Sequence, residues 1–275
     1  MAVRSPIRWL GGKSTIAPWV LAKLPSHTTY VEPFGGGASI LLSKTRVKKE
    51  VYCDVDIRLV RLFRELRDNC DEFLQRLYTT PYSRQMRNLR LGKKDPLSFF
   101  VCSQQSFGGM VDKTAWGMVT SHSSRGMAST VRHYVQVIEA LPRISERLQG
   151  VKVLRGSWER TIKYDSTSTL FYLDPPYVPD TRRDGEYEHE MSLEDHYRFV
   201  EGIQQLRGSV VLSGYPNDVY AQLEDAGWER YDKATTCMVA ARTKATGLKG
   251  SGGVKENQKR TESLWLNEKA RRRRG

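Results

Sequence analysis

One stretch restricts the possible folds more than any other: the apolar run Thr169–Leu173, which stops at Asp174-Pro175-Pro176-Tyr177. A short apolar and aromatic run between polar segments is typical of a buried strand. Proline has no backbone N–H, so the strand must end where the two prolines begin. Proline also biases the residue before it toward extended backbone. We therefore expect a stiff loop at the carboxyl end of a strand, where open α/β sheets bind their ligands.

This loop places hydrogen-bond acceptors beside an aromatic ring. The acceptors are the Asp174 carboxylate and the backbone carbonyls before Tyr177, which no local N–H can pair with because the prolines carry none. Acceptors beside a ring suit a planar amine, since the acceptors take its N–H bonds and the ring stacks on its face. The loop thus predicts a site for such an amine; the alternative is a surface turn that happens to carry Asp174 and Tyr177.

A glycine-rich turn follows the first predicted strand, Thr29–Glu32. Pro33 and Phe34 lead into Gly35, Gly36 and Gly37, and an apolar helix comes next. In nucleotide-binding sheets the first turn of this kind lets backbone approach a polar ligand at a helix N-terminus. The spacing is not G-x-G-x-x-G, so a nicotinamide dinucleotide is disfavoured.

A second predicted strand runs from Glu50 to Asp56. Asp54 ends its apolar part and lies about 20 residues after the glycine turn, where doubly wound folds place an acid that binds ribose hydroxyls. Asp56 is predicted to cap the helix that begins at Ile57.

The segment Trp9-Leu10-Gly11-Gly12-Lys13 comes before both motifs. Two glycines and a lysine are similar to the end of a P-loop, but no glycine lies five positions before Gly12 and no strand precedes the segment. We therefore exclude a P-loop ATPase. The glycines are instead expected to let backbone approach a ligand, with Trp9 and Lys13 beside it.

Four motifs in this order, Trp9–Lys13, Glu32–Gly37, Asp54 and Asp174–Tyr177, resemble the Dam-like, D12-class DNA adenine-N6 methyltransferases. The resemblance implies an α/β protein: a Rossmann-like methyltransferase sheet with helices on both faces, plus a smaller, mostly helical target-recognition insert. It predicts a catalytic domain that binds S-adenosyl-L-methionine and a DNA target-recognition domain. Their expected ranges are 1–70 with 151–275, and 71–150.

The resemblance also implies roles for individual residues. Asp174 and the Pro175 carbonyl would accept hydrogen bonds from the target amine, and Tyr177 would stack on a flipped-out adenine. The implied cofactor-binding residues are Trp9, Lys13, Pro33, Phe34, Gly35, Gly37, Asp54 and Asp174. Cytosine-N4 methylation is an alternative because both amines suit the loop, although the motif order favours adenine. A catalytically inactive DNA-binding module on the same fold is a second alternative, which the intact loop disfavours.

The formal net charge of +13 favours a polyanionic partner, here double-stranded DNA. Arg84, Arg87, Arg90 and Lys94 recur at near-helical spacing and predict a basic face that contacts phosphates, or one that is only solvated.

Base specificity is expected between about Ser103 and Thr130, in a polar segment that carries Lys113 and Arg125. Arg125 is the best candidate for a contact with a guanine edge. Phe107-Gly108-Gly109 resembles the Dam-like pattern, but Ser103-Gln104-Gln105 replaces the usual Asn-Arg pair before it, so recognition of GATC stays open.

The later part of the chain predicts elements that complete the sheet. Val210–Ser213 reads as another buried strand, and Ser192 with Asp195 forms the pattern of a helix capping box. Residues 236–242 and 263–267 predict a late antiparallel pair of strands.

The spacing of the cysteines and the length of the apolar runs indicate where in the cell the protein is expected. Cys53, Cys70, Cys102 and Cys237 form no C-x-x-C pair, so we expect no disulfide framework and no zinc or other metal site. No apolar run approaches the length of a membrane span. The expected location is the cytoplasm, with nucleoid association through DNA, and a cognate restriction endonuclease is a candidate partner.

Overall fold

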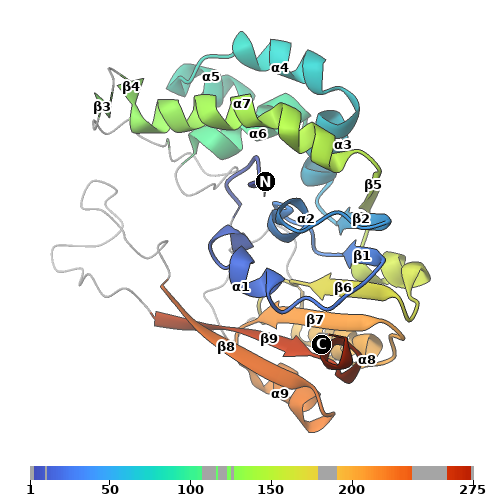
Figure 1. Cartoon of the computed structure of the whole chain (residues 1–275). Helices are drawn as coiled ribbons and strands as arrows, with labels where there is room; N and C mark the ends of the chain where they lie inside the picture. Colours follow the sequence, from blue (N-terminus) through green and yellow to red (C-terminus); the bar gives the residue numbers. More distant parts are fainter. Residues whose placement is uncertain are drawn as a thin grey trace, which may run out of the picture.

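A seven-stranded sheet forms the centre of the computed structural model, which describes residues 3–9, 11–106, 116, 123–124, 127–178, 191–236 and 259–273 (Figure 1). The strand order is β5-β2-β1-β6-β7-β9-β8. Strands β5, β2, β1, β6 and β7 pair in parallel, whereas β9 is antiparallel to β7 and β8. Their bounds are β1 Thr29–Glu32, β2 Lys49–Asp54, β5 Val151–Arg155, β6 Thr169–Leu173, β7 Ser209–Gly214, β8 Glu229–Thr236 and β9 Lys259–Leu266.

The strands alternate their side chains between two cores, as period-two geometry requires. Tyr30, Tyr52 and Tyr172 enter one core, while their neighbours Val31 and Phe171 enter the other. The first core is covered by α1 (Ala17–Leu21), α2 (Ser39–Ser43), α3 (Ile57–Asp68) and α10 (Glu268–Arg272). The second is covered by the 3₁₀ helix η3 (Trp158–Tyr164), α8 (Leu193–Gln204) and α9 (Asp218–Asp225). The predicted Rossmann-like sheet with helices on both faces is confirmed.

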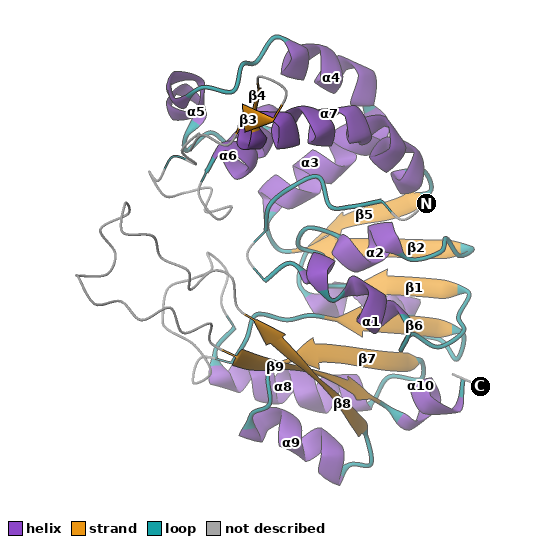
Figure 2. Cartoon of the chain, turned by 60° about the vertical axis from the view of Figure 1, so that its left-hand side comes forward, coloured by secondary structure: helices purple, strands orange, loops and turns teal. Residues whose placement is uncertain are grey.

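The described residues between Cys70 and Leu148 add helices beyond α3, seen at the top of Figure 2. The rings of Tyr52 and Phe63 lie 4.8 Å apart, and those of Phe73 and Phe100 lie 5.8 Å apart, within one continuous core. The helical part therefore packs as an extension of the sheet's first core, and the division into two domains stays a prediction. These helices are α4 (Cys70–Tyr78), α5 (Arg84–Arg90), α6 (Pro96–Gln105) and α7 (Ser129–Leu148), with a two-residue pair β3 (Ser123–Ser124) and β4 (Met127–Ala128) before α7.

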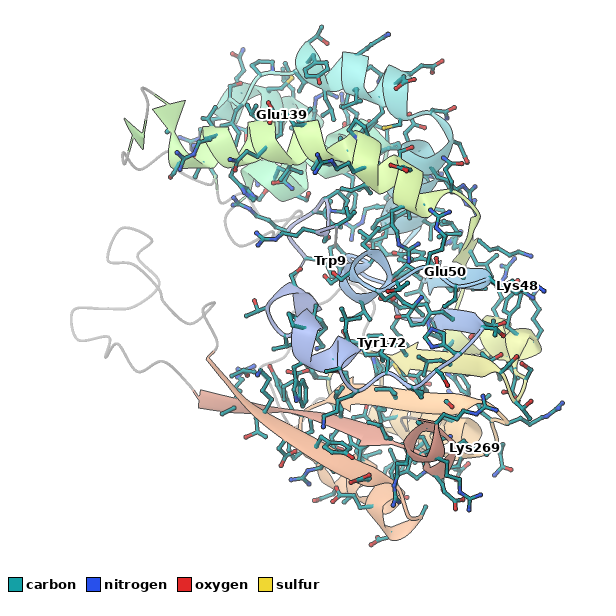
Figure 3. The ribbon with its side chains drawn as sticks, viewed as in Figure 1. Trp9, Lys48, Glu50, Glu139, Tyr172 and Lys269 are labelled. Carbon is teal, nitrogen blue, oxygen red and sulfur yellow. The ribbon has the colours of Figure 1, made fainter. Side chains whose placement is uncertain are left out.

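Helix α7 continues through Pro142 and is tied to the sheet near its end. Arg147 donates to Glu50 at 2.6 Å and to the Leu41 carbonyl at 2.6 Å, and Lys44 also lies 2.6 Å from Glu50. Burial alone would raise the pKa of Glu50, but the hydrogen bonds from Arg147 and Lys44 lower it below its ordinary value. Glu50, labelled in Figure 3, thus anchors α7 at the amino end of β2.

The late antiparallel pair exists, but the predicted bounds of its first strand were wrong. Strand β8 begins at Glu229, whereas the prediction began at Thr236. The reason is composition: β8 starts with Glu229 and Arg230 and carries Asp232 and Lys233, so it lacks an apolar run. As the outer strand it packs one neighbour only, β9.

Candidate active site

Loops from several strands meet at one edge of the sheet, because parallel strands all end on the same side. Asp54 closes β2, Asp174 follows β6, and Tyr215 follows β7. Strand β9 runs in the opposite direction, so Glu262, near its start, reaches the same edge. Lys13, in the 3₁₀ helix η1 (Lys13–Thr15), joins them from the N-terminal segment. We call Asp174–Tyr177 the catalytic loop from here on.

Lys13 lies at the centre of this group and is only 5% exposed. Its Nζ lies 3.0 Å from Asp174 Oδ1, 2.8 Å from Glu262 Oε1 and 2.8 Å from the Tyr177 hydroxyl. An ammonium group has three N–H donors, and these three acceptors match them in number. Lys13 therefore joins the N-terminal segment, the catalytic loop and β9.

The charges of this group are mutually dependent. Burial alone would lower the pKa of Lys13, but the neighbouring Asp174, Tyr177 and Glu262 raise it well above its ordinary value, so Lys13 stays charged. Burial raises the pKa of Asp174 to about 6; Lys13 opposes this effect, and the negative charge of Glu262 adds to it. Asp174 is thus ionised at neutral pH and takes up a proton in mildly acidic solution.

The Tyr177 ring stacks on Tyr215, with ring centroids 4.0 Å apart and planes 17° from parallel. The guanidinium of Arg260 lies 5.4 Å from the centre of the Tyr215 ring. The Tyr177 hydroxyl lies 3.4 Å from both carboxylate oxygens of Glu262, which also accepts from Ser213 at 3.2 Å. One face of the Tyr177 ring is therefore covered by the Tyr215 ring.

The glycine turn packs against aromatic rings of the protein itself. A Cβ at Gly35 would lie 2.1 Å from the Tyr52 ring, and one at Gly36, whose φ is +46°, would lie 3.0 Å from the Trp9 indole. The Trp9 ring also meets Phe99 of α6 edge-on at 6.1 Å. Figure 3 shows Trp9 between the sheet and the upper helices. Glycine is required here for internal packing, and the expected approach to a ligand stays a prediction.

Asp54 lies at the end of β2, as the sequence predicts, and its carboxylate binds backbone N–H groups. It accepts from Gly36 N and Asp56 N, both at 2.8 Å. The adjacent Val55 is 39% exposed. Phe34, which follows β1, packs edge-on against Phe199 of α8.

The predicted helix cap at Asp56 is confirmed, because its carboxylate accepts from the Arg58 N–H at 2.8 Å.

Glu32, which ends β1 directly before Pro33, is buried and serves the fold. It accepts from the Tyr30 hydroxyl at 2.7 Å and from the Leu41 N–H at 3.0 Å. Burial raises its pKa to about 8, although the Tyr30 hydrogen bond opposes the rise. This carboxyl connects β1 to α2 and is mostly protonated at neutral pH.

The prediction of one exposed basic face through Arg84 and Arg87 is wrong for Arg87. Arg87 is fully buried, and its Nε donates to Ser106 at 2.9 Å. Residues three apart lie on the same side of a helix, so the sequence spacing is correct. However, the part of α5 around Arg87 packs on α6, whereas Arg84 lies at the start of α5 and is exposed. Lys113 and Arg125 lie outside the described residues.

Sequence reasoning missed two members of the site, Tyr215 and Glu262. Neither belongs to a motif, and the predicted last strand began one residue after Glu262. One signal was available: a glutamate that precedes Ser263-Leu264-Trp265-Leu266 in the same strand is a charge that needs a partner once buried.

Two comparisons relate the chain to known proteins. A family model described as D12 class N6 adenine-specific DNA methyltransferase matches residues 9–236. Type II methyltransferase M1.LlaDCHI of Lactococcus lactis subsp. cremoris is 26% identical over 215 residues, 72% of this chain and 75% of that protein. Type II methyltransferase M.MjaIII of Methanocaldococcus jannaschii is 24% identical over 208 residues, 65% of this chain and 71% of that protein. Strand β9 lies beyond the range that the family model matches.

Proposed function

Because the chain belongs to the D12 class of N6 adenine-specific DNA methyltransferases, we propose that its catalytic loop, Asp174–Tyr177, holds the adenine that is methylated. The reaction, methylation of adenine N6 in DNA, follows from the family and from its type II relatives. The observation that supports the site is the group around Lys13, which holds Asp174 and Tyr177 together at the carboxyl edge of the sheet.

The loop has the donors and acceptors that the reaction needs. An adenine inside a duplex cannot reach the sheet edge, so it must be flipped out. Asp174 and the Pro175 carbonyl accept hydrogen bonds from N6, which keeps the nitrogen lone pair out of conjugation with the ring and available for the methyl group. N6 gains a methyl group and loses a proton, and Asp174, with a pKa of about 6, can accept that proton near neutral pH. Tyr177 stacks on the base.

The residues at the same edge fit S-adenosyl-L-methionine, which supplies the methyl group when bound. Asp174 and Glu262 face the single ammonium of Lys13, so the group carries one excess negative charge, which suits a sulfonium cation. Asp54, at the end of β2, is the candidate for the ribose hydroxyls, and the exposed Val55 offers an apolar surface beside it. The implied cofactor set also includes Trp9, Pro33, Phe34, Gly35 and Gly37. Lys13 already has three acceptors, which favours a positioning role over a direct contact with the cofactor.

Double-stranded DNA is the proposed macromolecular substrate, recognised by residues 71–150. The N-terminal segment lies between the upper helices and the sheet (Figure 1). Burial lowers the pKa of His133 in α7, and the charges of Arg8 and Arg4 lower it further, so these arginines lie near the helix. With the exposed Arg84 they are candidates for phosphate contacts, and Arg125 stays the candidate for a base contact.

Two finer points are proposals as well. A cognate restriction endonuclease is proposed because the relatives are named type II methyltransferases. Cytoplasmic location with nucleoid association is proposed from DNA binding alone. In the described part of the chain, no helix is long and apolar enough to cross a membrane. Likewise, no cluster of three or more His, Cys, Asp or Glu side chains there could hold a metal ion.

The test is transfer of label from radiolabelled S-adenosyl-L-methionine to mixed-sequence duplex DNA in EDTA, followed by sequencing that distinguishes N6-methyladenine from N4-methylcytosine. Label in adenine of the duplex is expected. DNA binding without transfer would favour an inactive module, N4-methylcytosine would favour the cytosine alternative, and label in RNA or protein alone would refute the proposal.

A further inference from the structure

Glu262 is a buried charge that lies against the catalytic loop. Its side chain is 6% exposed, and it belongs to β9, outside the range that the family model matches. The neighbouring register, Ser263 opposite Gly214 of β7, places Glu262 at the carboxyl edge of the parallel strands. A charged side chain is almost never buried without a partner, so the contacts of Glu262 indicate its role.

These contacts form a chain of hydrogen bonds in which Lys13 donates to Tyr177 and Tyr177 donates to Glu262. Lys13 Nζ donates to the Tyr177 hydroxyl at 2.8 Å and lies 2.8 Å from Glu262 Oε1. Because that hydroxyl accepts from Lys13, its own proton is free to point at Glu262, whose oxygens lie 3.4 Å away. The Ser213 hydroxyl donates to Glu262 from β7 at 3.2 Å. The Tyr177 ring is thus held at its hydroxyl end as well as at its backbone.

We propose that Glu262 is a positioning residue for methyl transfer: together with Lys13 it fixes Asp174 and Tyr177 in the arrangement that receives adenine. The proposal rests on the proposed function of the catalytic loop. Lys13 divides its three N–H groups among Asp174, Tyr177 and Glu262. Without the Glu262 charge, Lys13 is paired with Asp174 alone and competes with adenine N6 for the same carboxylate.

The charge of Glu262 also acts on the ionisation of Asp174. Burial and Glu262 raise the pKa of Asp174, and Lys13 lowers it. Removing the negative charge at residue 262 therefore lowers this pKa, and the acidic limb of the rate profile moves to lower pH. Loss of structure alone would reduce the rate at every pH without this displacement. Asp174 in turn acts on the groups that face it, which are Glu32, Tyr172, Tyr177 and Tyr220.

The test compares Glu262→Gln with Glu50→Gln as a matched control. Both glutamates are buried, but Glu50 pairs with Lys44 and Arg147 at the opposite end of the strands. Sequencing of modified bases first defines the target duplex. Single-turnover transfer is then measured at saturating cofactor between about pH 5 and 9, and cofactor affinity is measured by calorimetry.

For Glu262→Gln we expect transfer at neutral pH to slow by about 10- to 100-fold, because small displacements of reacting groups have effects of that size. Cofactor affinity should stay within about threefold of the wild type, so that the loss lies in transfer. The acidic limb should move to lower pH. Glu50→Gln should keep the wild-type transfer rate and the wild-type position of the acidic limb in the pH profile. A rate for Glu262→Gln equal to that of the control, or an unmoved limb, overturns the proposal. So does a fall in cofactor affinity large enough to account for the whole loss of rate.

One further variant, Glu262→Asp, and one spectroscopic probe, fluorotyrosine at residue 177, cover the cases in which Glu262→Gln is unstable or the wild type is inactive. If Glu262→Gln unfolds at lower temperature than Glu50→Gln, Glu262→Asp replaces it: transfer should slow while the limb stays in place, and a moved limb overturns the proposal. If the wild type labels no DNA, the proposed function fails, and fluorotyrosine at residue 177 decides separately. Glu262→Gln should then shift its ¹⁹F resonance and speed ring flipping, and an unchanged resonance overturns the positioning role.

Discussion

Replacing Lys13 with methionine tests how much the buried ion group contributes to stability. The substitution keeps a long unbranched side chain and removes the ammonium that lies 3.0 Å from Asp174 and 2.8 Å from Glu262. Removing one partner of a buried pair typically costs about 3–5 kcal/mol. Asp174 is 18% exposed, so water compensates part of its lost partner and the lower figure of about 3 kcal/mol applies. For a domain of this size we expect the Tm to fall by about 6–12 °C.

The loss should depend on pH with a definite sign. Lys13 lowers the pKa of Asp174, so removing it raises that pKa further above about 6. An acid whose pKa is raised in the folded state destabilises that state when ionised, and this cost disappears as pH falls and the acid is protonated. Lys13 itself stays charged in the wild type across this range, because its own pKa is raised. The difference in Tm between variant and wild type should therefore be larger at about pH 8 than at about pH 5.

Differential scanning calorimetry at the two pH values measures both effects, and Lys48→Met, at an exposed lysine labelled in Figure 3, is the control. The reasoning is refuted if Lys13→Met and Lys48→Met lower the Tm equally, or if the loss at Lys13 does not change between the two pH values.

Further predictions concern activity and binding. Asp174→Asn should reduce single-turnover transfer by about 10²–10⁴-fold, and the wild-type rate should fall as pH drops through about 6, the pKa of Asp174; a rate independent of pH there would contradict the assigned role. Asp54→Ala should weaken cofactor binding by about 5- to 150-fold, measured by calorimetry. Tyr177→Ala should instead slow transfer and be partly rescued by a mismatched target; equal losses of cofactor affinity without rescue would place Tyr177 in the cofactor site. Arg84→Ala should lower the log–log salt slope of DNA binding by about one, whereas Arg87→Ala should mainly lower the Tm; an unchanged slope for Arg84→Ala would mean that Arg84 is only solvated.

The parts of the site that sequence predicts are those determined by local chemistry. Asp174 and Asp54 each lie where an apolar strand stops, and in a parallel sheet those ends must share an edge. The caps at Asp56 and at Ser192, whose side chain accepts from the Asp195 N–H, follow from residue type and from spacing over two or three positions.

The parts that sequence did not predict depend on packing between distant segments. Strand β9 lies antiparallel between β7 and β8, and no local sequence pattern predicts this position. The sequence therefore did not predict which residues Glu262 contacts. Arg87 has the spacing of a solvated residue, but the position of α6 decides which face of α5 is covered. Trp9 is expected beside a ligand, and it also packs against Gly36, a contact that only the tertiary structure reveals.

The separation in sequence among the residues that meet at Lys13 has a consequence for the order of folding. Lys13 and Tyr177 are 164 residues apart, and Tyr177 and Glu262 are 85 apart, so the group closes two long loops of the chain. Contacts of such long range form late, because the chain must first lose the entropy of closing those loops. The catalytic loop can therefore reach its final arrangement only after β9 has entered the sheet. Methyl transfer by this protein is thus a property of the finished fold, and local opening of β9, with β8 beyond it, would remove Glu262 from Lys13 and slow transfer while the parallel strands stay paired.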